Sequence, residues 1–234
     1  MSDTKDSKQT ALQHLQSSPF FVGLSAPAVQ KALAQLITRH HPAEQIILLE
    51  NDWGSSVYFV LNGWLKIRTF NMEGKEITLN ILGVGEMFGE MSPLDQTPRS
   101  TDVLTLTEAT IASIPASAFM ELLATEPQAG IHLARLLARR LRQLNRRIRL
   151  READSTCRIA DLLLFLAESQ GKATPAGVVI PNLPHRELSS LSGLARETVT
   201  RVLGKLEKNA LIRRDPEKDL IYIPNLTALE DIVS

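Results

Sequence analysis

The chain has 234 residues, 44% of them hydrophobic and 22% charged, a composition typical of a globular protein long enough for two domains. Basic and acidic residues balance at 26 each. No apolar run reaches the ~18 residues of a membrane-spanning helix, and the polar first residues do not resemble a secretory signal. We therefore expect a cytoplasmic protein with no membrane partner. The single cysteine, Cys157, excludes an intrachain disulfide framework and a cluster held by four thiolates of this chain, and we place it in the core.

The first dozen residues are polar, and we expect them to be disordered. A helix is predicted next, because Ser25 is a suitable N-cap and apolar residues recur behind it at helical spacing. The residues of this apolar face are Val29, Leu33, Leu36 and Ile37.

Short runs rich in β-forming residues, separated by glycine turns, extend from Glu44 to Pro115. The predicted strands are Ile46–Leu49, Val57–Leu61, Leu65–Phe70, Ile77–Leu82 and Ala109–Ile114. Asn62-Gly63 predicts a tight hairpin between the second and third runs, since both positions tolerate positive φ. Many short strands with glycine turns predict a closed β-roll or barrel.

A long helix is predicted from about Gln128 to Ala153, in a stretch where residues 126–153 hold 8 Arg against 2 Glu. Its apolar residues repeat in alternating steps of three and four, which is a heptad seam. They are Ala134, Leu137, Leu141, Leu144 and Ile148. A narrow seam edged by arginines favours a homodimer, although a long helix lying on its own domain stays an alternative. A further apolar helix is predicted over residues 157–169, and the Gly- and Pro-rich stretch Gly171–Pro184 is predicted to be a loop.

The segment from Phe88 to Thr101 pairs a carboxylate, that of Glu90, with one arginine and small hydroxyl residues around a short turn. A cyclic phosphate needs a cation that stays charged and binds in a bidentate way, which favours Arg99. Ser100 and free backbone N–H groups complete a phosphate cradle, and ionised Glu90 suits a ribose hydroxyl. On these residues alone, a structural Arg–Glu pair beside a turn is the more frequent explanation.

Two short helices separated at Gly193 are predicted between Leu183 and Glu207, which is the pattern of a helix-turn-helix. The second helix has an inward face of Val199, Val202, Leu203 and Leu206. Its other face carries polar side chains near the N-terminus, where a recognition helix meets base edges. With Arg186 on the first helix, the candidate DNA-binding residues are Arg196, Glu197, Thr200 and Arg201. Arg213 and Arg214, followed by Leu220–Ile223, predict a β-wing whose cations reach phosphate.

The segment Phe88-Gly89-Glu90 followed by Pro98-Arg99 resembles the phosphate-binding cassette of cyclic-nucleotide-binding domains. In that family the glutamate holds the ribose 2′-hydroxyl and the arginine holds the cyclic phosphate. The resemblance therefore implies these roles for Glu90 and Arg99, with Gly89, Met91 and Ser100 lining the cradle.

The stretch Arg196-Glu197-Thr198-Val199-Thr200-Arg201 resembles the recognition helix of the cAMP receptor protein branch of the CRP/FNR family. The resemblance implies an α+β fold with a β-roll domain at residues 1–125, a dimerisation helix at 126–153 and a winged helix-turn-helix at 154–234. It also implies a transcription regulator that reads TGTGA-type half-sites, takes cAMP as an effector with no tightly bound cofactor, and has double-stranded DNA, a second copy and RNA polymerase as partners. We predict no catalytic site and no metal site, since no nucleophile–base constellation or metal-ligand spacing occurs.

One departure affects the base of the nucleotide. In the cAMP receptor branch, a threonine and a serine of the long helix contact the adenine, and Leu144 and Asn145 stand at these positions here. Leucine cannot hydrogen-bond an adenine amine, whereas Asn145 can if its side chain turns inward. The effector hypotheses are therefore cAMP first, then cGMP or a cyclic dinucleotide such as c-di-GMP. A haem or redox sensor of the same family is a further alternative, with little beyond His40-His41 to favour it.

Overall fold

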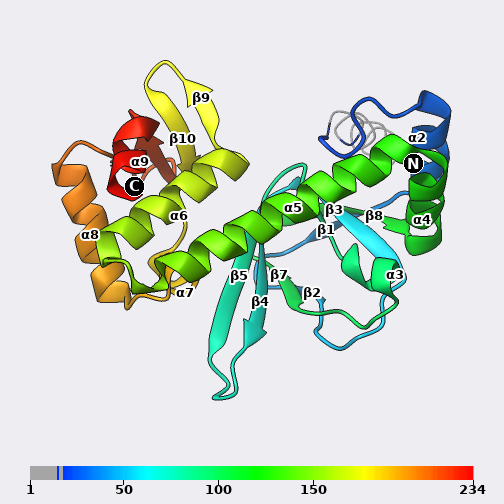
Figure 1. Ribbon diagram of the computed structural model, residues 1–234, viewed down its shortest axis with the longest axis horizontal. Coiled ribbons are helices and arrows are strands. Elements are labelled where there is room, and N and C mark those ends of the chain that lie inside the picture. Colours follow the sequence, from blue (N-terminus) through cyan, green and yellow to red (C-terminus); the bar gives the residue numbers. More distant parts are fainter. Residues whose placement is uncertain (1–14, 16–17, 234) are drawn as a thin grey trace. The chain divides into compact units, whose positions relative to one another are not determined.

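The computed structural model describes residue 15 and residues 18–233, so the predicted disorder of the first dozen residues lies outside the described residues. The chain divides into two compact units, Met1–Arg139 and Arg140–Ser234 (Figure 1). The division falls within one long helix, α5 (Pro127–Arg149), which therefore contributes to both units. The three domain ranges expected from the sequence stay predictions.

The first unit is a β-roll of two four-stranded sheets with antiparallel pairing throughout. One sheet has the order β1-β8-β3-β6, formed by Ile37–His41, Ala109–Pro115, Ser56–Asn62 and Met87–Phe88. The other has the order β2-β7-β4-β5, formed by Ile46–Leu48, Asp102–Thr105, Leu65–Phe70 and Glu76–Leu82. With the helices described below, this confirms the predicted α+β fold and the β-roll.

Helices α2 (Ala26–Leu33), α4 (Ala116–Thr125) and the first turns of α5 share one hydrophobic core with the roll, and this core includes a group of aromatic rings. The ring of Phe20 lies 5.7 Å from that of Phe119 and 6.2 Å from that of Phe59. Such rings remove large apolar areas from water and favour tilted or edge-on contacts. Ala129 and Leu133 of α5 are buried in the same core, so the roll packs against the start of the long helix.

Two local predictions in this unit were wrong. The first helix ends at Leu33, and Ile37 instead begins β1, where it pairs with Ser113 of β8. Asn62-Gly63 is not a tight hairpin, because β3 and β4 belong to different sheets. Gly63 has φ +85° and an ideal Cβ there would lie 2.3 Å from the carbonyl oxygen of Glu108. The glycine thus lets the chain cross closely from one sheet to the other.

The second unit contains the C-terminal part of α5, a 3₁₀ turn at Leu150–Glu152, and the central helix α6 (Ser155–Gln170). Around α6 lie α7 (His185–Ser192), α8 (Arg196–Lys208) and α9 (Leu226–Val233). Its sheet has the order β11-β12-β10-β9, formed by Arg213–Asp215, Leu220–Ile223, Gly177–Pro181 and Lys172–Thr174. The stretch predicted as a loop thus holds a hairpin, because Val179 and Ile180 bury their side chains.

The end of α5 packs on α6 through a polar contact. Arg146 forms an ion pair with the buried Asp161, and the guanidinium of Arg147 lies 4.7 Å from the ring centroid of Phe165. Burial raises the pKa of Asp161, although both guanidinium groups favour its carboxylate.

Cys157 is buried on the same helix, as predicted. Within the described residues, no helix has the length and apolarity needed to cross a membrane.

Candidate ligand site and nucleic-acid interface

The phosphate-binding cassette folds as a tight reversal that begins at the end of β6. Gly89 has φ +74°, and the short helix α3 (Met91–Asp95) follows directly. Gln96, in the left-handed region at φ +56°, ends this helix, and the hydroxyl of Ser92 donates to the carbonyl oxygen of Thr97 at 2.6 Å. These turns bring the chain back so that Arg99 lies beside Gly89.

Arg99 is 4% exposed and Glu90 2% exposed, so both charged side chains are buried. The guanidinium donates through Nη1 to the carbonyl oxygen of Gly89 and through Nη2 to that of Ser56 at 2.8 Å. It also lies 5.8 Å from the ring centroid of Tyr58. Burial lowers the pKa of Arg99, while Tyr58 and Glu90 favour its charged form. The guanidinium therefore stays a cation, and its buried Nε has no hydrogen-bond partner among the described residues.

Gly54 is a part of this site that the sequence did not reveal, since the glycines between the predicted strands, Gly54 among them, were interpreted only as turn residues. An ideal Cβ at Gly54 would lie 2.1 Å from Nη2 of Arg99, and one at Gly89 would lie 2.9 Å from Nη1. The two glycines thus leave the space that the guanidinium fills. The loop is held in place because Asn51 and Asp52 exchange backbone hydrogen bonds with Arg99, each 2.8 Å long.

The remaining candidate ligand residues are less enclosed. Met91 is 48% exposed at the first position of α3, and Ser100 is exposed beside Arg99. Asn145 is exposed on α5 in the second unit. Gly89, Glu90 and Arg99 are therefore the predicted ligand residues that the first unit brings together.

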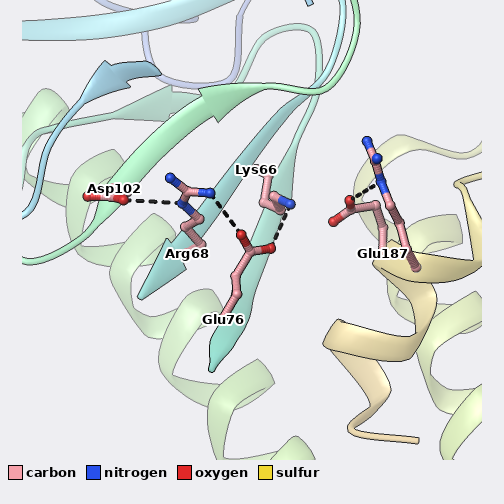
Figure 2. A network of polar contacts seen from close by, with 6 residues as sticks. Lys66, Arg68, Glu76, Asp102 and Glu187 are labelled. Carbon is pink, nitrogen blue, oxygen red and sulfur yellow. Dashed lines mark hydrogen bonds and ion pairs between the residues drawn. The ribbon is translucent and has the colours of Figure 1, made fainter. Parts of the chain in front are cut away.

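A second charged cluster in the first unit is neutralised internally. Figure 2 shows Arg68 between Glu76 and Asp102, with Nη1 2.8 Å from the Glu76 carboxylate and Nε 3.1 Å from that of Asp102. Lys66 donates to Glu76 at 2.8 Å. Burial tends to raise the pKa of Glu76, but the hydrogen bonds from Lys66 and Arg68 hold it below its ordinary value. This network ties the β4–β5 hairpin to β7.

The helix-turn-helix has the predicted division of faces. Gly193 has φ +66° and ends α7, which lets the chain turn into α8. The four apolar residues predicted to face inward are all buried, whereas Arg196, Glu197, Thr200 and Arg201 are exposed. Arg158 of α6 supports the turn, because its guanidinium donates to the carbonyl oxygens of Ser192 and Arg151.

The other candidate DNA residues have specific partners. Glu187, labelled in Figure 2, is buried and accepts a hydrogen bond from Nε of Arg186 at 3.0 Å. The side chain of Arg186 is 49% exposed. Thr200 lies 2.8 Å from Nδ1 of His185. Thr200 also donates to the carbonyl oxygen of Arg196 at 3.0 Å, so its hydroxyl hydrogen is used inside α8.

The predicted wing is formed by β11 and β12, and its two arginines differ. Arg214 donates to Glu207 of α8 through Nε at 3.0 Å and Nη2 at 2.6 Å. These bonds, with one from the Arg214 backbone, lower the pKa of Glu207. Arg213 lies 4.2 Å above the ring centroid of Tyr222. Arg214 thus fixes the wing to α8, and only Arg213 is left exposed on the strand.

Comparison with known proteins agrees with this arrangement. Residues 38–126 match the cyclic nucleotide-binding domain, and residues 157–232 match the Crp-like helix-turn-helix domain. The cyclic AMP receptor protein of Thermus thermophilus is 33% identical over 93% of this chain and 98% of its own length. The chain belongs to the CRP/FNR family.

Two further relatives support the same assignment across nearly the whole chain. The CRP-like cAMP-activated global transcriptional regulator of Mycobacterium tuberculosis is 32% identical over 86% of this chain and 91% of its own. The crystal structure of the Thermus thermophilus catabolite activator protein is 32% identical, with a TM-score of 0.51 over 92% of this chain and 98% of that one. As a CRP/FNR member, the protein is a cyclic-nucleotide-binding, DNA-binding transcription regulator, and its relatives act as regulators rather than as enzymes.

Proposed function

We propose that this CRP/FNR regulator is a homodimer that binds TGTGA-type palindromic DNA in response to cAMP. The observation that carries the proposal is the cassette, where the buried Arg99 guanidinium lies beside buried Glu90 and keeps one N–H that no residue described in the structure accepts. A cation held in this way suits an anionic ligand whose phosphate reaches Nε and whose ribose hydroxyl donates to the carboxylate.

The exposed face of α8 supports the DNA half of the proposal. Arginine recognises the O6 and N7 atoms of guanine, and glutamate accepts from the N4 amine of cytosine. Arg196, Glu197 and Arg201 provide these groups on the first two turns of one helix. Because DNA is the partner, we place the protein in the cytoplasm, where it acts on transcription together with RNA polymerase and without catalysis of its own.

The long helix supports the homodimer. Three residues of the seam expose large apolar side chains in the single chain, with Leu141 58%, Leu144 44% and Ile148 66% exposed. An apolar stripe at heptad spacing is the usual contact between two identical helices. A two-fold dimer of this kind would match a palindrome and set its two recognition helices about 34 Å apart, one turn of DNA.

Asn145 is the residue that we propose to contact the base, because Leu144 offers no hydrogen-bonding group. The arginines of α5 favour a cyclic dinucleotide as a second candidate effector, since guanidinium groups stack on bases and bind phosphates. Isothermal titration calorimetry with cAMP, cGMP and c-di-GMP separates these effectors. Loss of ligand binding in Arg99→Gln, in a protein that still unfolds cooperatively, is the expected signature of the cassette.

The complete proposal is tested with a fluorescently labelled TGTGA palindrome and a scrambled duplex of the same composition. We expect cAMP to raise the affinity for the palindrome more than for the scrambled duplex. Equal affinities with and without cAMP would exclude cAMP as the effector, and equal affinities for both duplexes would exclude TGTGA recognition. Arg196→Gln should reduce discrimination at its base pair by about 1–3 kcal/mol rather than weaken binding to all sequences alike.

A further inference from the structure

The end of the long helix lies on α6 without apolar packing of its own. The buried residues of α5, Ala129 and Leu133, both belong to the first unit. Every residue from Arg140 to Arg149 is exposed or half-buried. The position of this segment against α6 therefore depends on the polar contacts of Arg146 and Arg147.

Asp161 of α6 is the acidic partner in these contacts. It is 6% exposed and forms an ion pair with Nε of Arg146. The guanidinium of Arg147 lies over the ring of Phe165, one helical turn beyond Asp161. Burial lowers the pKa of Arg147, and the Asp161 carboxylate favours its charged form. One carboxylate thus stabilises two guanidinium groups at the end of α5.

The same face of α6 reaches the helix-turn-helix. Arg158, three residues before Asp161, donates to the carbonyl oxygen of Ser192, beside the glycine that ends α7. It also donates to the carbonyl oxygen of Arg151 in the 3₁₀ turn at 3.3 Å. Helix α6 packs directly against α8 as well. The contacts to the end of α5 and to the turn before the recognition helix thus lie one helical turn apart on α6.

The seam of the proposed dimer lies on the same segment of α5. Leu141, Leu144 and Ile148 expose their side chains there, while the two arginines between and beside them contact α6. A second copy on one side and α6 on the other would therefore hold the same part of the helix. Rigid contacts on both sides fix the spacing between the two recognition helices of a dimer.

We propose that Asp161 is a positioning residue that joins the end of α5 and the recognition helix α8 into one rigid body. The turn at Leu150–Glu152 is then not a hinge. The inference rests on the proposed homodimer and DNA binding, and it adds the residue that relates the seam to the recognition helix. A buried ion pair suits this role because it contributes little net stability in place of apolar packing, yet selects one arrangement of the groups that it joins.

A pair of spin labels within one chain measures whether the two helices move together. Arg142→Cys on α5 and Lys208→Cys on α8 place the labels at exposed positions. A Cys157→Ala background removes the other thiol of the chain. Asp161→Asn keeps the size of the side chain and removes the charge that both guanidinium groups face. By double electron–electron resonance, we expect a narrow label–label distance distribution in the parent and a broad one in Asp161→Asn.

Two further variants control this measurement. Glu168→Gln is the matched control, because Glu168 also lies on α6 with Oε1 3.6 Å from Nη1 of Arg146, but its side chain is 61% exposed. Water screens such a charge, so the distribution should stay narrow. Arg146→Gln removes the ion pair from its more exposed side and should broaden the distribution, so it decides the outcome where Asp161→Asn fails to fold.

The consequence for DNA is measured with cAMP present, on the TGTGA palindrome and on one lengthened by two central base pairs. The insertion rotates one half-site by roughly 70° relative to the other, so wild type should bind the longer site at least about tenfold more weakly. Asp161→Asn should lose most of this difference and keep the wild-type affinity for a duplex with a single half-site. Structural damage to the DNA-binding unit would instead lower the half-site affinity.

The distances and the affinities decide separately. A narrow distribution in both Asp161→Asn and Arg146→Gln overturns the inference, whatever the DNA result. A broad distribution with the wild-type spacing preference also overturns it, because Asp161 would then not set the spacing. If wild type binds the palindrome and the scrambled duplex alike, TGTGA recognition fails, and a broad distribution in Asp161→Asn beside a narrow one in Glu168→Gln still supports the rigid body.

Discussion

Replacement of Gly54 by alanine tests whether ligand affinity and stability require the Arg99 guanidinium to lie where the structure places it. The backbone at Gly54 is outside the left-handed region, so alanine is tolerated there, but the new Cβ would lie 2.1 Å from Nη2, 2.3 Å from Nε and 2.4 Å from Cζ of Arg99. The guanidinium must therefore move. Because it is the end of a flexible side chain, the steric cost is small, and the main cost is the loss of its bonds to the carbonyl oxygens of Gly89 and Ser56.

Hydrogen bonds to a charged group contribute about 1.5–3 kcal/mol each, and Arg99 regains part of this from water when it leaves. We expect Gly54→Ala to lower the free energy of unfolding by about 2–3 kcal/mol. We also expect it to lower the affinity for cAMP by at least about tenfold, because loss of one charged hydrogen bond to the phosphate reduces affinity by about this factor. Urea denaturation and calorimetry measure the two effects.

Gly130→Ala is the matched control, because Gly130 lies on α5 and a Cβ there meets no atom within 4 Å. Alanine should stabilise this helix by up to about 1 kcal/mol and leave cAMP affinity unchanged. The reasoning is refuted if Gly54→Ala binds cAMP as wild type does, because Arg99 would then act equally well from another position.

Three further predictions concern the second unit. The carboxylate of Asp154 caps α6 by accepting hydrogen bonds from the backbone N–H groups of Cys157 and Thr156, which lowers the pKa of Asp154. Asp154→Ala should therefore lower the free energy of unfolding by about 1 kcal/mol at neutral pH. In urea titrations this difference should disappear as pH falls below about 4, because only the ionised carboxylate stabilises the helix. Glu207→Gln should lower stability by less than about 1 kcal/mol because the pair with Arg214 is partly exposed, and the deficit should shrink at high salt; a salt-independent deficit would contradict this. Leu203 is fully buried, so Leu203→Ala should lower the free energy of unfolding by about 2–5 kcal/mol. Leu141 is 58% exposed, so Leu141→Ala should leave the unfolding of the single chain nearly unchanged. The same variant should raise the dimer dissociation constant measured by analytical ultracentrifugation.

The sequence was most informative where function or fold depends on residues close together in the chain. Fourteen consecutive positions contain both charges of the cassette, and the two faces of α8 follow from helical periodicity alone. The strands Leu65–Phe70 and Ser56–Asn62 were also found within a residue or so at each end, since β-branched and aromatic residues are concentrated there.

The errors arose where a distant segment decides the local structure. Asn62-Gly63 has the composition of a hairpin turn, yet closure of the roll pairs β3 with β8 and β4 with β7, so the turn becomes a crossing between sheets. Ile37 continues a helical pattern, but pairing with β8 draws it into a strand. In both cases a long-range ladder of backbone hydrogen bonds outweighs a local preference.

The same distinction separates the parts of the candidate site. The identity of Arg99 is visible in the sequence, but its setting depends on Gly54 and on the carbonyl oxygen of Ser56, more than forty residues away in the chain. Nothing about a lone glycine indicates which side chain will occupy the space beside it. On α8, periodicity likewise identifies Thr200 as exposed, whereas its bond to His185 depends on how α7 packs against it. Residue types thus identify the groups that meet a ligand, and the fold determines the partners that set the charge and hydrogen-bonding state of those groups.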